Sequence, residues 1–178
     1  MEEKKIAIGA DHAGFELKEY LKEYLKNKNI EVIDFGCNST ESVNYPGFAV
    51  AVGEYIFDKI EEDFDEIGCE MPDDDAKCFY QNSNHKGILI CGTGSGMCIA
   101  ANKVFSIRAV NCYSKEIASL AVQHNNANIL CLGARFIGKE LAKEIVDAFL
   151  EAKFEGERHL ERILEIHNLT EIFVDDDE

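Results

Sequence analysis

The sequence predicts an α/β fold in which a parallel β-sheet carries helices on both faces. Short apolar runs alternate with helical patterns along the chain, and this alternation is typical of βαβ units with right-handed crossovers. The 178 residues, 46% of them hydrophobic, are enough for one domain with its own core. We expect that single domain to cover residues 1–170.

Five apolar runs that end in turn residues are the predicted strands. They cover residues 5–11 (KIAIGAD), 31–36 (EVIDFG), 87–92 (GILICG), 108–113 (RAVNCY) and 129–134 (ILCLGA).

Segments with the apolar periodicity of a helix alternate with these strands. Segments 15–29 and 138–152 each place apolar residues on one face of a helix. The predicted faces consist of Leu17, Leu21, Tyr24 and Leu25 in the first segment, and of Leu141, Ile145, Ala148 and Phe149 in the second. A further helix over about residues 157–167 follows the last strand.

The formal charge of −16 is concentrated in two segments. Residues 61–75 carry nine acids and no base, and residues 171–178 carry five acids and no base. The rest of the chain holds 20 acidic and 18 basic residues, so it can bind an anionic substrate. No basic stripe is present, and we expect no nucleic-acid partner.

We interpret residues 61–85 as an acidic insertion and residues 171–178 as an acidic tail. The insertion joins a helix to a strand, and such connections lie at the edge of a parallel sheet opposite the ligand-binding edge. We therefore expect a solvated, mobile segment without regular structure, away from the active site. Alternatively, Cys69, Cys78 and His85 could bind zinc, although their spacing contains no close cysteine pair.

The cysteine pattern and the chain start predict a cytoplasmic protein. The seven cysteines are an odd number, and four of them lie in apolar segments, which suits reduced thiols rather than disulfides. The chain opens MEEKK without a leader pattern, and no apolar run approaches the ~20 residues of a membrane span.

The strongest functional motif is CGTGSG at residues 91–96, between a predicted strand and a predicted helix. Successive backbone N–H groups in a glycine-rich turn form a concave anion site. The positive field of such a turn also favours the thiolate form of a nearby cysteine. Cys91 is therefore a candidate for proton transfer, and the alternative is a small buried hydrophobe.

A dinucleotide fingerprint is a competing interpretation of this loop. It requires glycine at position 97, where Met97 stands, and it normally follows the first strand. Asp34, at the end of the second strand, imitates the ribose-binding acid of dinucleotide-binding proteins. A nucleotide-binding module therefore remains an alternative.

Polar residues also lie next to other predicted element ends. Asp11 and His12 lie at the carboxyl end of the first strand, where catalytic groups collect, but Asp11 could equally cap the next helix. His124 and Asn125 end a helical segment, where a histidine by default is a helix cap or a core residue. Arg135 follows the last strand.

Arg158 and Arg162 lie one helical turn apart on a single face. Two guanidinium groups with this spacing could bind one phosphate. The alternative is a solvated face with weak ion pairs to neighbouring glutamates.

Taken together, these motifs resemble the type B ribose-5-phosphate isomerase family, which includes the subunits of galactose-6-phosphate isomerase. The motifs are GADHAGFELK (9–18), NYPGFA (44–49), ILICGTGSGMCIAANK (88–103), IRAV (107–110), QHNNANILCLGAR (123–135) and EGERHLERI (155–163). They occur in the right order and cover nearly the whole chain outside the acidic insertion and tail. The resemblance implies a three-layer αβα sandwich with a Rossmann-like five-stranded parallel sheet. It also implies a homodimer whose active sites are shared between the subunits and whose dimer contact involves a C-terminal helix. Two such dimers could pair into a tetramer.

The resemblance further implies interconversion of an aldose phosphate and its ketose through an enediolate, without metal or cofactor. Cys91 would move a proton between C1 and C2, with Thr93 assisting, and His124 with Asp11 nearby would open the sugar ring. Backbone amides of residues 92–96 would stabilise the enediolate. The implied substrate-binding residues are His12, Tyr45, Gly92, Gly94, Ser95, Gly96, Asn102, Asn125, Arg135, Arg158 and Arg162, among which His12 and the three arginines would hold the phosphate.

Ribose 5-phosphate and ribulose 5-phosphate are the expected substrate and product. Allose or galactose 6-phosphate is an alternative, because the sequence does not give the pocket length, and a non-catalytic module binding a sugar phosphate is another. One branch of the family carries a glutamate base after the last loop glycine, and Met97 at that place indicates the cysteine type. Asn44 replaces a common aspartate, which affects only local hydrogen bonding. Because Cys91, His124 and the arginines occur in one chain, we expect two identical subunits.

Overall fold

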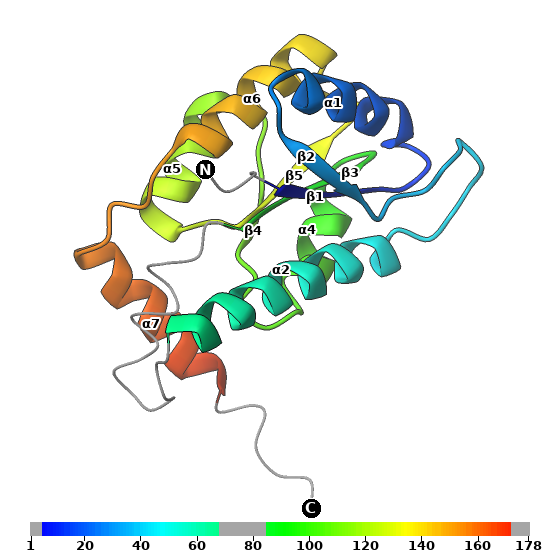
Figure 1. Cartoon of the computed structure of the whole chain (residues 1–178). Coiled ribbons are helices and arrows are strands. Elements are labelled where there is room, and N and C mark those ends of the chain that lie inside the picture. The colour runs from blue at the N-terminus through cyan, green and yellow to red at the C-terminus, as the bar shows by residue number, and fades with distance from the viewer. Residues whose placement is uncertain (1–4, 68–84, 172–178) are drawn as a thin grey trace, which may run out of the picture.

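The sheet has five parallel strands in the order β2-β1-β3-β5-β4 (Figure 1). The computed structural model describes residues 5–67 and 85–171. The strands are β1 (Lys5–Ala10), β2 (Glu31–Asp34), β3 (Lys86–Cys91), β4 (Ala109–Asn111) and β5 (Ile129–Gly133). Neighbouring strands all pair in parallel, which confirms the predicted sheet.

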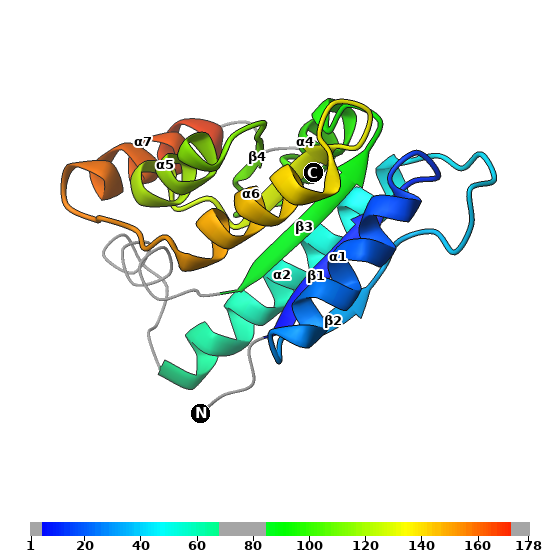
Figure 2. The same ribbon diagram turned by 90° about the horizontal axis from the view of Figure 1, so that it is seen from above.

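Helices cover both faces of the sheet and complete the three-layer αβα sandwich. One layer contains α1 (Phe15–Asn27), α5 (Lys115–Asn125) and α6 (Lys139–Glu151), and the other contains α2 (Pro46–Ile67) and α4 (Ser95–Ala101). After the last strand, α7 (Arg158–Glu171) lies beside α5 (Figure 2). The predicted fold class is confirmed.

Alternation along β3 gives each helical layer its own apolar core. Ile88 and Ile90 belong to the cluster under α1, α5 and α6, whereas Leu89 and Cys91 belong to the cluster under α2 and α4. Successive side chains of a strand point to opposite faces. The Cys91 side chain therefore faces the α2–α4 layer.

The sheet changes its direction of growth between β1 and β3. Strand β2 lies outside β1, whereas β5 and β4 lie outside β3, and Ala10 at the end of β1 pairs with Ile90 near the end of β3. The loops that leave such a pair of strands diverge, and the resulting crevice is where α/β sheets bind ligands.

The buried face of α6 differs from the predicted one. Leu141 is 37% exposed and Ala148 is half-buried, whereas Ile145 and Phe149 are buried as expected. The buried face consists of Ala142, Ile145, Val146 and Phe149. Both sets have the spacing of a helical stripe, and the buried stripe is rotated from Leu141 and Ala148 toward Ala142 and Val146.

Helix α2 continues further than the sequence indicated. It runs to Ile67, so the first residues of the expected insertion 61–85 are helical rather than irregular. His85 contacts Asp63 of this helix, with 2.9 Å between Nε2 and Oδ2. Residues 68–84, with Cys69 and Cys78 of the zinc alternative, lie outside the described residues, as does the tail beyond residue 171.

A buried lysine ties α1 to the end of β2. The Lys18 side chain has no exposed surface, and its Nζ donates to Asp34 Oδ2 at 2.5 Å. Lys22 donates to the same oxygen at 2.6 Å, and the Gly36 amide donates to Oδ1 at 2.8 Å. Both oxygens of Asp34 are therefore engaged, which disfavours a ribose-binding role and with it the dinucleotide alternative.

We expect Asp34→Asn to lower the free energy of unfolding by about 2 kcal/mol at neutral pH. Burial raises the pKa of Asp34, but hydrogen bonds from Lys18 and Lys22 outweigh it, so the pKa lies below its ordinary value. A carboxyl with a lowered pKa stabilises the fold above its unfolded-state pKa, and that stabilisation disappears as the pH falls through the folded-state pKa. The loss should therefore shrink in acid.

Urea unfolding at a series of pH values measures this difference. The matched control is Glu23→Gln, which neutralises an exposed acid on α1, the helix that carries Lys18 and Lys22, and should have little effect. A loss for Asp34→Asn that stays constant into acid would contradict the assignment.

Candidate active site

The loops after β1 and β3 lie side by side at the carboxyl edge of the sheet. The Asp11 amide donates to the Ile90 carbonyl at 3.2 Å, which places Asp11 beside the start of the glycine-rich loop. The loop after β5 joins them, because the Arg135 amide donates to the Gly92 carbonyl at 3.1 Å. Three sequence-predicted segments thus meet at one edge.

The glycine-rich loop turns back onto the Cys91 sulfur. The Gly94 amide donates to Cys91 Sγ at 3.1 Å, and the thiol is only 5% exposed. Gly94 has a φ of 79°, a left-handed conformation that glycine adopts without steric cost. The turn is continued by the Ser95 amide, which donates to Thr93 Oγ1 at 3.3 Å. The thiol is therefore buried but directly contacted by a backbone donor.

Close approach of two side chains requires the other loop glycines. A Cβ added at Gly92 would lie 3.1 Å from Arg135 Nε, and one added at Gly96 would lie 2.7 Å from the Tyr45 ring. Larger residues at either position would displace these groups. The structure therefore brings Tyr45 and Arg135 to the same loop as Cys91.

Asp11 and His12 both make local hydrogen bonds. Asp11 Oδ1 accepts from the amides of Ala13 at 2.9 Å and Gly14 at 3.1 Å, so the turn-stabilising role is real. His12 Nδ1 accepts from the Val43 amide at 3.2 Å. This bond fixes a tautomer in which Nε2 carries the proton and can donate to a ligand.

Four other predicted residues lie at the opposite edge of the sheet. His124 and Asn125 end α5, and the chain then returns to the amino end of β5, where the Gly87 amide donates to the Asn128 carbonyl at 2.8 Å. Arg158 and Arg162 lie on α7, which packs beside α5. Since a strand rises about 3.3 Å per residue, the five residues of β5 separate the two groups by roughly 13 Å. One chain does not bring His124 close to Asp11 or Cys91.

The group at this second edge contains a histidine pair that the sequence did not single out. The rings of His124 and His159 stack with centroids 4.4 Å apart, and Glu155 lies 3.9 Å and 3.6 Å from their Nε2 atoms. Burial lowers the pKa of His159, and the charges of His124 and Arg158 lower it further. His159 stands between the two arginines of GERHLER, which was the available sequence signal.

Three potential metal ligands occur in this histidine group. Ligand atoms of His124, Glu155 and His159 lie within 4.8 Å of one another. However, Arg158 Nε donates to His159 Nε2 at 3.5 Å, so the lone pair needed for a metal is in use beside a positive charge. The nearby guanidinium therefore disfavours a cation at this group.

The Asn102 side chain is exposed and hydrogen-bonds to the backbone. Its Nδ2 donates to the carbonyls of Cys98 and Ala109, each at 2.9 Å, and its Oδ1 accepts from the Ala109 amide at 2.9 Å. The amide group therefore fastens the end of α4 to β4.

Other thiols near the loop show what burial and hydrogen bonding do to cysteine. A hydrogen bond from Cys131, against the opposing effect of burial, lowers the pKa of Cys98 to about 7. Burial raises the pKa of Cys112 to about 11 and that of Cys131 well above its ordinary value. Buried thiols in this core thus stay protonated unless a donor faces them.

We expect Gly94→Ala to destabilise the fold by about 1–3 kcal/mol, because the new Cβ would require a strained left-handed backbone. It would also lie 2.3 Å from Asn111 Oδ1. The control is Gly47→Ala, where no atom lies within 4 Å of the added Cβ. Thermal unfolding measures both variants, and equal effects would contradict the assigned role of Gly94.

Comparison with known proteins gives a consistent result. Residues 6–166 match the Ribose/Galactose Isomerase family. The chain is 43% identical over 160 residues to ribose-5-phosphate isomerase B of Escherichia coli strain K12, covering 90% of this chain and 92% of that one. It is 41% identical over 152 residues to D-erythrulose-4-phosphate isomerase of Pectobacterium atrosepticum, covering 85% of each.

A solved structure agrees with these sequence matches. Ribose-5-phosphate isomerase B of Mycoplasma genitalium with bound ribulose-5-phosphate superposes with a TM-score of 0.77 at 38% identity. The match covers 94% of this chain and 96% of that one.

Proposed function

The chain belongs to the ribose/galactose isomerase family, and from this premise we propose that it interconverts ribose 5-phosphate and ribulose 5-phosphate. The observation that carries the proposal is the donation of the Gly94 amide to Cys91 Sγ at the ligand-binding edge of the sheet. This edge supplies both a base and fixed donors, which proton transfer beside a carbonyl requires.

In the proposed reaction Cys91 is the base. Its thiolate takes the proton from C2 of the open-chain aldose, and the electron pair moves to the carbonyl oxygen to give an enediolate. Backbone amides of residues 92–96 stabilise that oxyanion, and Thr93 assists at the substrate hydroxyls. The thiol then returns the proton to C1, while the O2 proton is lost and O1 is protonated. The reaction is an internal redox exchange and consumes no cofactor.

Two copies of the chain would complete the site. His124 and Asp11 are roughly 13 Å apart along the strands in one chain, so they could act together in ring opening only if they came from different subunits. His124 would move a proton between the anomeric hydroxyl and the ring oxygen. Exposed apolar side chains next to the glycine loop, Ile99 at 65% and Phe136 at 68%, are available for burial against a second copy.

Substrate contacts divide between the two groups of residues. We assign His12 and Arg135 from one copy, and Arg158 and Arg162 from the other, to the phosphate. Arginine binds phosphate through paired N–H donors, and the three guanidinium groups supply the positive charge that faces the phosphate. Tyr45 and Asn125 would line the sugar.

We place the reaction in the cytoplasm. The five described cysteines are all free, which suits a reducing compartment. No helix in the ranges 5–67 and 85–171 combines the length and apolarity needed to cross a membrane.

The number of carbon atoms in the sugar has more than one candidate value. The Pectobacterium relative is named for a four-carbon substrate at nearly the same identity as the relative named for ribose 5-phosphate. A tetrulose phosphate is therefore the second candidate, and the six-carbon phosphates of allose and galactose complete the set.

We expect turnover with ribose 5-phosphate, in the presence of a chelator, to exceed turnover with the aldoses erythrose 4-phosphate, allose 6-phosphate and galactose 6-phosphate. Cys91→Ala should lose about 10²–10⁴-fold in kcat, because a positioned base contributes that much, and should still bind ribose 5-phosphate. A coupled ketose assay and calorimetry measure the two effects. Binding without turnover in the unaltered protein would instead identify a non-catalytic module.

Subunit mixing tests the shared site. Cys91→Ala and His124→Ala should each be nearly inactive, but refolding them together should restore up to about a quarter of normal activity. Half of the randomly formed dimers are mixed, and each mixed dimer regains one intact site. Mixing Cys91→Ala with Asp11→Ala is the control: both residues come from the same edge of one chain, so every site of a mixed dimer lacks one of them and no activity should return. Activity that never recovers with His124→Ala would place both residues in one chain's site.

A further inference from the structure

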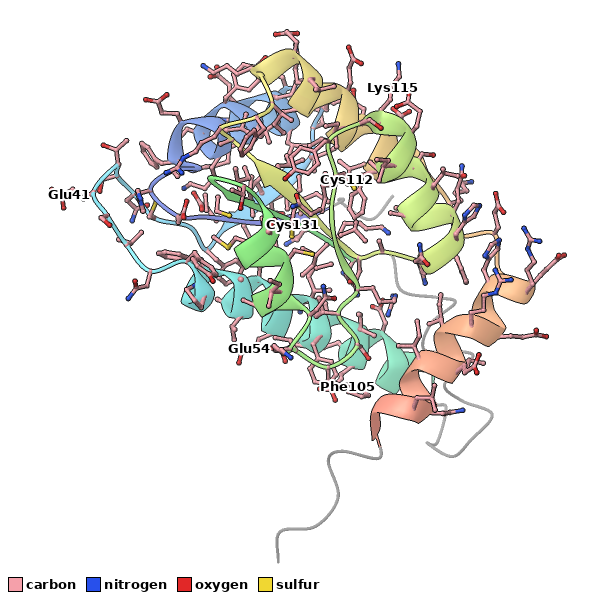
Figure 3. All side chains as sticks on the ribbon, turned by 180° about the vertical axis from the view of Figure 1, so that it is seen from behind. Glu41, Glu54, Phe105, Cys112, Lys115 and Cys131 are labelled. Atoms are coloured by element: carbon pink, nitrogen blue, oxygen red, sulfur yellow. The ribbon has the colours of Figure 1, made fainter. Side chains whose placement is uncertain are left out.

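We propose that Tyr113, together with Asn111, is a positioning residue that holds the Gly94 amide on the Cys91 sulfur. The inference rests on the proposed role of Cys91. Neither residue belongs to the motifs that predicted the site, and both come from the carboxyl end of β4 and the turn after it. In Figure 3 the segment from β4 to Lys115 runs beside α4, the helix that follows the glycine-rich loop.

The carbonyl of Thr93 has two side-chain donors. The Tyr113 hydroxyl donates to it at 2.6 Å, and Asn111 Nδ2 donates to it at 3.1 Å. Asn111 Nδ2 also lies 3.2 Å from the Tyr113 hydroxyl and 3.1 Å from Ser95 Oγ, so its two N–H groups are shared among these two oxygens and the Thr93 carbonyl. Each donor therefore reinforces the other, because a hydroxyl that accepts one hydrogen bond donates another more strongly.

The peptide between Thr93 and Gly94 transmits this restraint to the thiol. A trans peptide is planar, so its carbonyl oxygen and its N–H point in opposite directions. The oxygen of this peptide points to Tyr113 and Asn111, and its N–H donates to Cys91 Sγ at 3.1 Å. Fixing the oxygen therefore aims the N–H, and donors on the oxygen also polarise the N–H toward the sulfur.

Without the two donors this peptide would be easily turned. Glycine accepts backbone conformations on both sides of φ zero, so the peptide before Gly94 can rotate at little steric cost. A rotated peptide would present its carbonyl oxygen to the sulfur and repel the thiolate. The side chains of Asn111 and Tyr113 prevent that rotation.

The orientation of the Asn111 side chain leaves one of its polar atoms without a hydrogen bond within the described part of the chain. Its Oδ1 is buried against Gly94 and has no hydrogen-bond partner among the described residues. A buried acceptor without a partner destabilises a fold and calls for an explanation. Here the three oxygens in reach of Nδ2 fix the orientation of the amide, and Oδ1 is left against the glycine.

Other titratable groups face the same loop and stay unchanged by a substitution at Tyr113. They are Asp11 after β1, Tyr45 before α2, Cys98 on α4, Cys131 on β5 and Arg135 after β5. An effect of Tyr113→Phe on Cys91 is therefore attributable to the 93–94 peptide.

The experiment titrates the thiolate of Cys91 directly. Ultraviolet thiolate absorbance is recorded against pH for the unaltered protein and for Tyr113→Phe, and the curve of the same protein carrying Cys91→Ala is subtracted in each case. We expect the Cys91 titration midpoint to move to higher pH in Tyr113→Phe, with about three- to tenfold less thiolate at neutral pH. Isomerase turnover should show a lower kcat with little change in KM.

Tyr20→Phe is the matched control, because it removes a tyrosine hydroxyl that donates to Glu140 at 3.2 Å on the outer helices. Its titration curve should coincide with that of the unaltered protein. Asn111→Ala supplies a second variant that removes the other donor and should shift the midpoint in the same direction. Thermal unfolding reports whether each variant is folded.

An unchanged Cys91 midpoint in folded Tyr113→Phe and Asn111→Ala would overturn the proposal, even if stability fell. The titration does not depend on the substrate. If the unaltered protein isomerised no sugar phosphate while the midpoint still moved, the proposed function would fail and the positioning role would stand.

Discussion

The contact between the Gly94 amide and the Cys91 sulfur exists because several parts of the fold constrain it together. Alternation along β3 turns the sulfur toward the α2–α4 layer, and the left-handed Gly94 brings the loop back over it. In our proposal Asn111 at the end of β4 and Tyr113 in the turn after it then hold the carbonyl of the same peptide. The hydrogen bond from the Gly94 amide to Cys91 Sγ thus depends on a neighbouring strand, on the turn and on the position of the thiol.

The other thiols of this core show why such a donor matters. For Cys112 and Cys131 no interaction with the described residues offsets the effect of burial, and burial raises the pKa of both thiols. Cys98 is also partly buried, but a hydrogen bond from Cys131 brings its pKa to about 7. Burial penalises the thiolate, and at Cys98 a hydrogen-bond donor offsets that penalty. A catalytic thiol inside an apolar layer therefore depends on the loop that covers it.

The candidate site residues lie at two opposite edges of the sheet. Association of two copies of the chain would therefore have a chemical role. In a parallel α/β unit the strand ends and the ends of the following helices face opposite directions, so residues after β1, β3 and β5 cannot approach residues at the end of α5 within one chain. In our proposal a second copy supplies His124 and the α7 arginines. Dimerisation would then be a condition of catalysis rather than only a source of stability.

The sequence alone determined the strands, the glycine loop and the family resemblance, because these depend on local periodicity and on residue types at fixed spacing. It also indicated Cys91, since a cysteine directly before three glycines is visible without coordinates. Tertiary structure decided the rest. Only pairing of β4 with β5 brings Tyr113 to Thr93, only the packing of α1 on β2 engages Asp34 with Lys18, and only the direction of α5 separates His124 from Cys91. Such contacts join residues far apart in the chain, where no short-range pattern reports them.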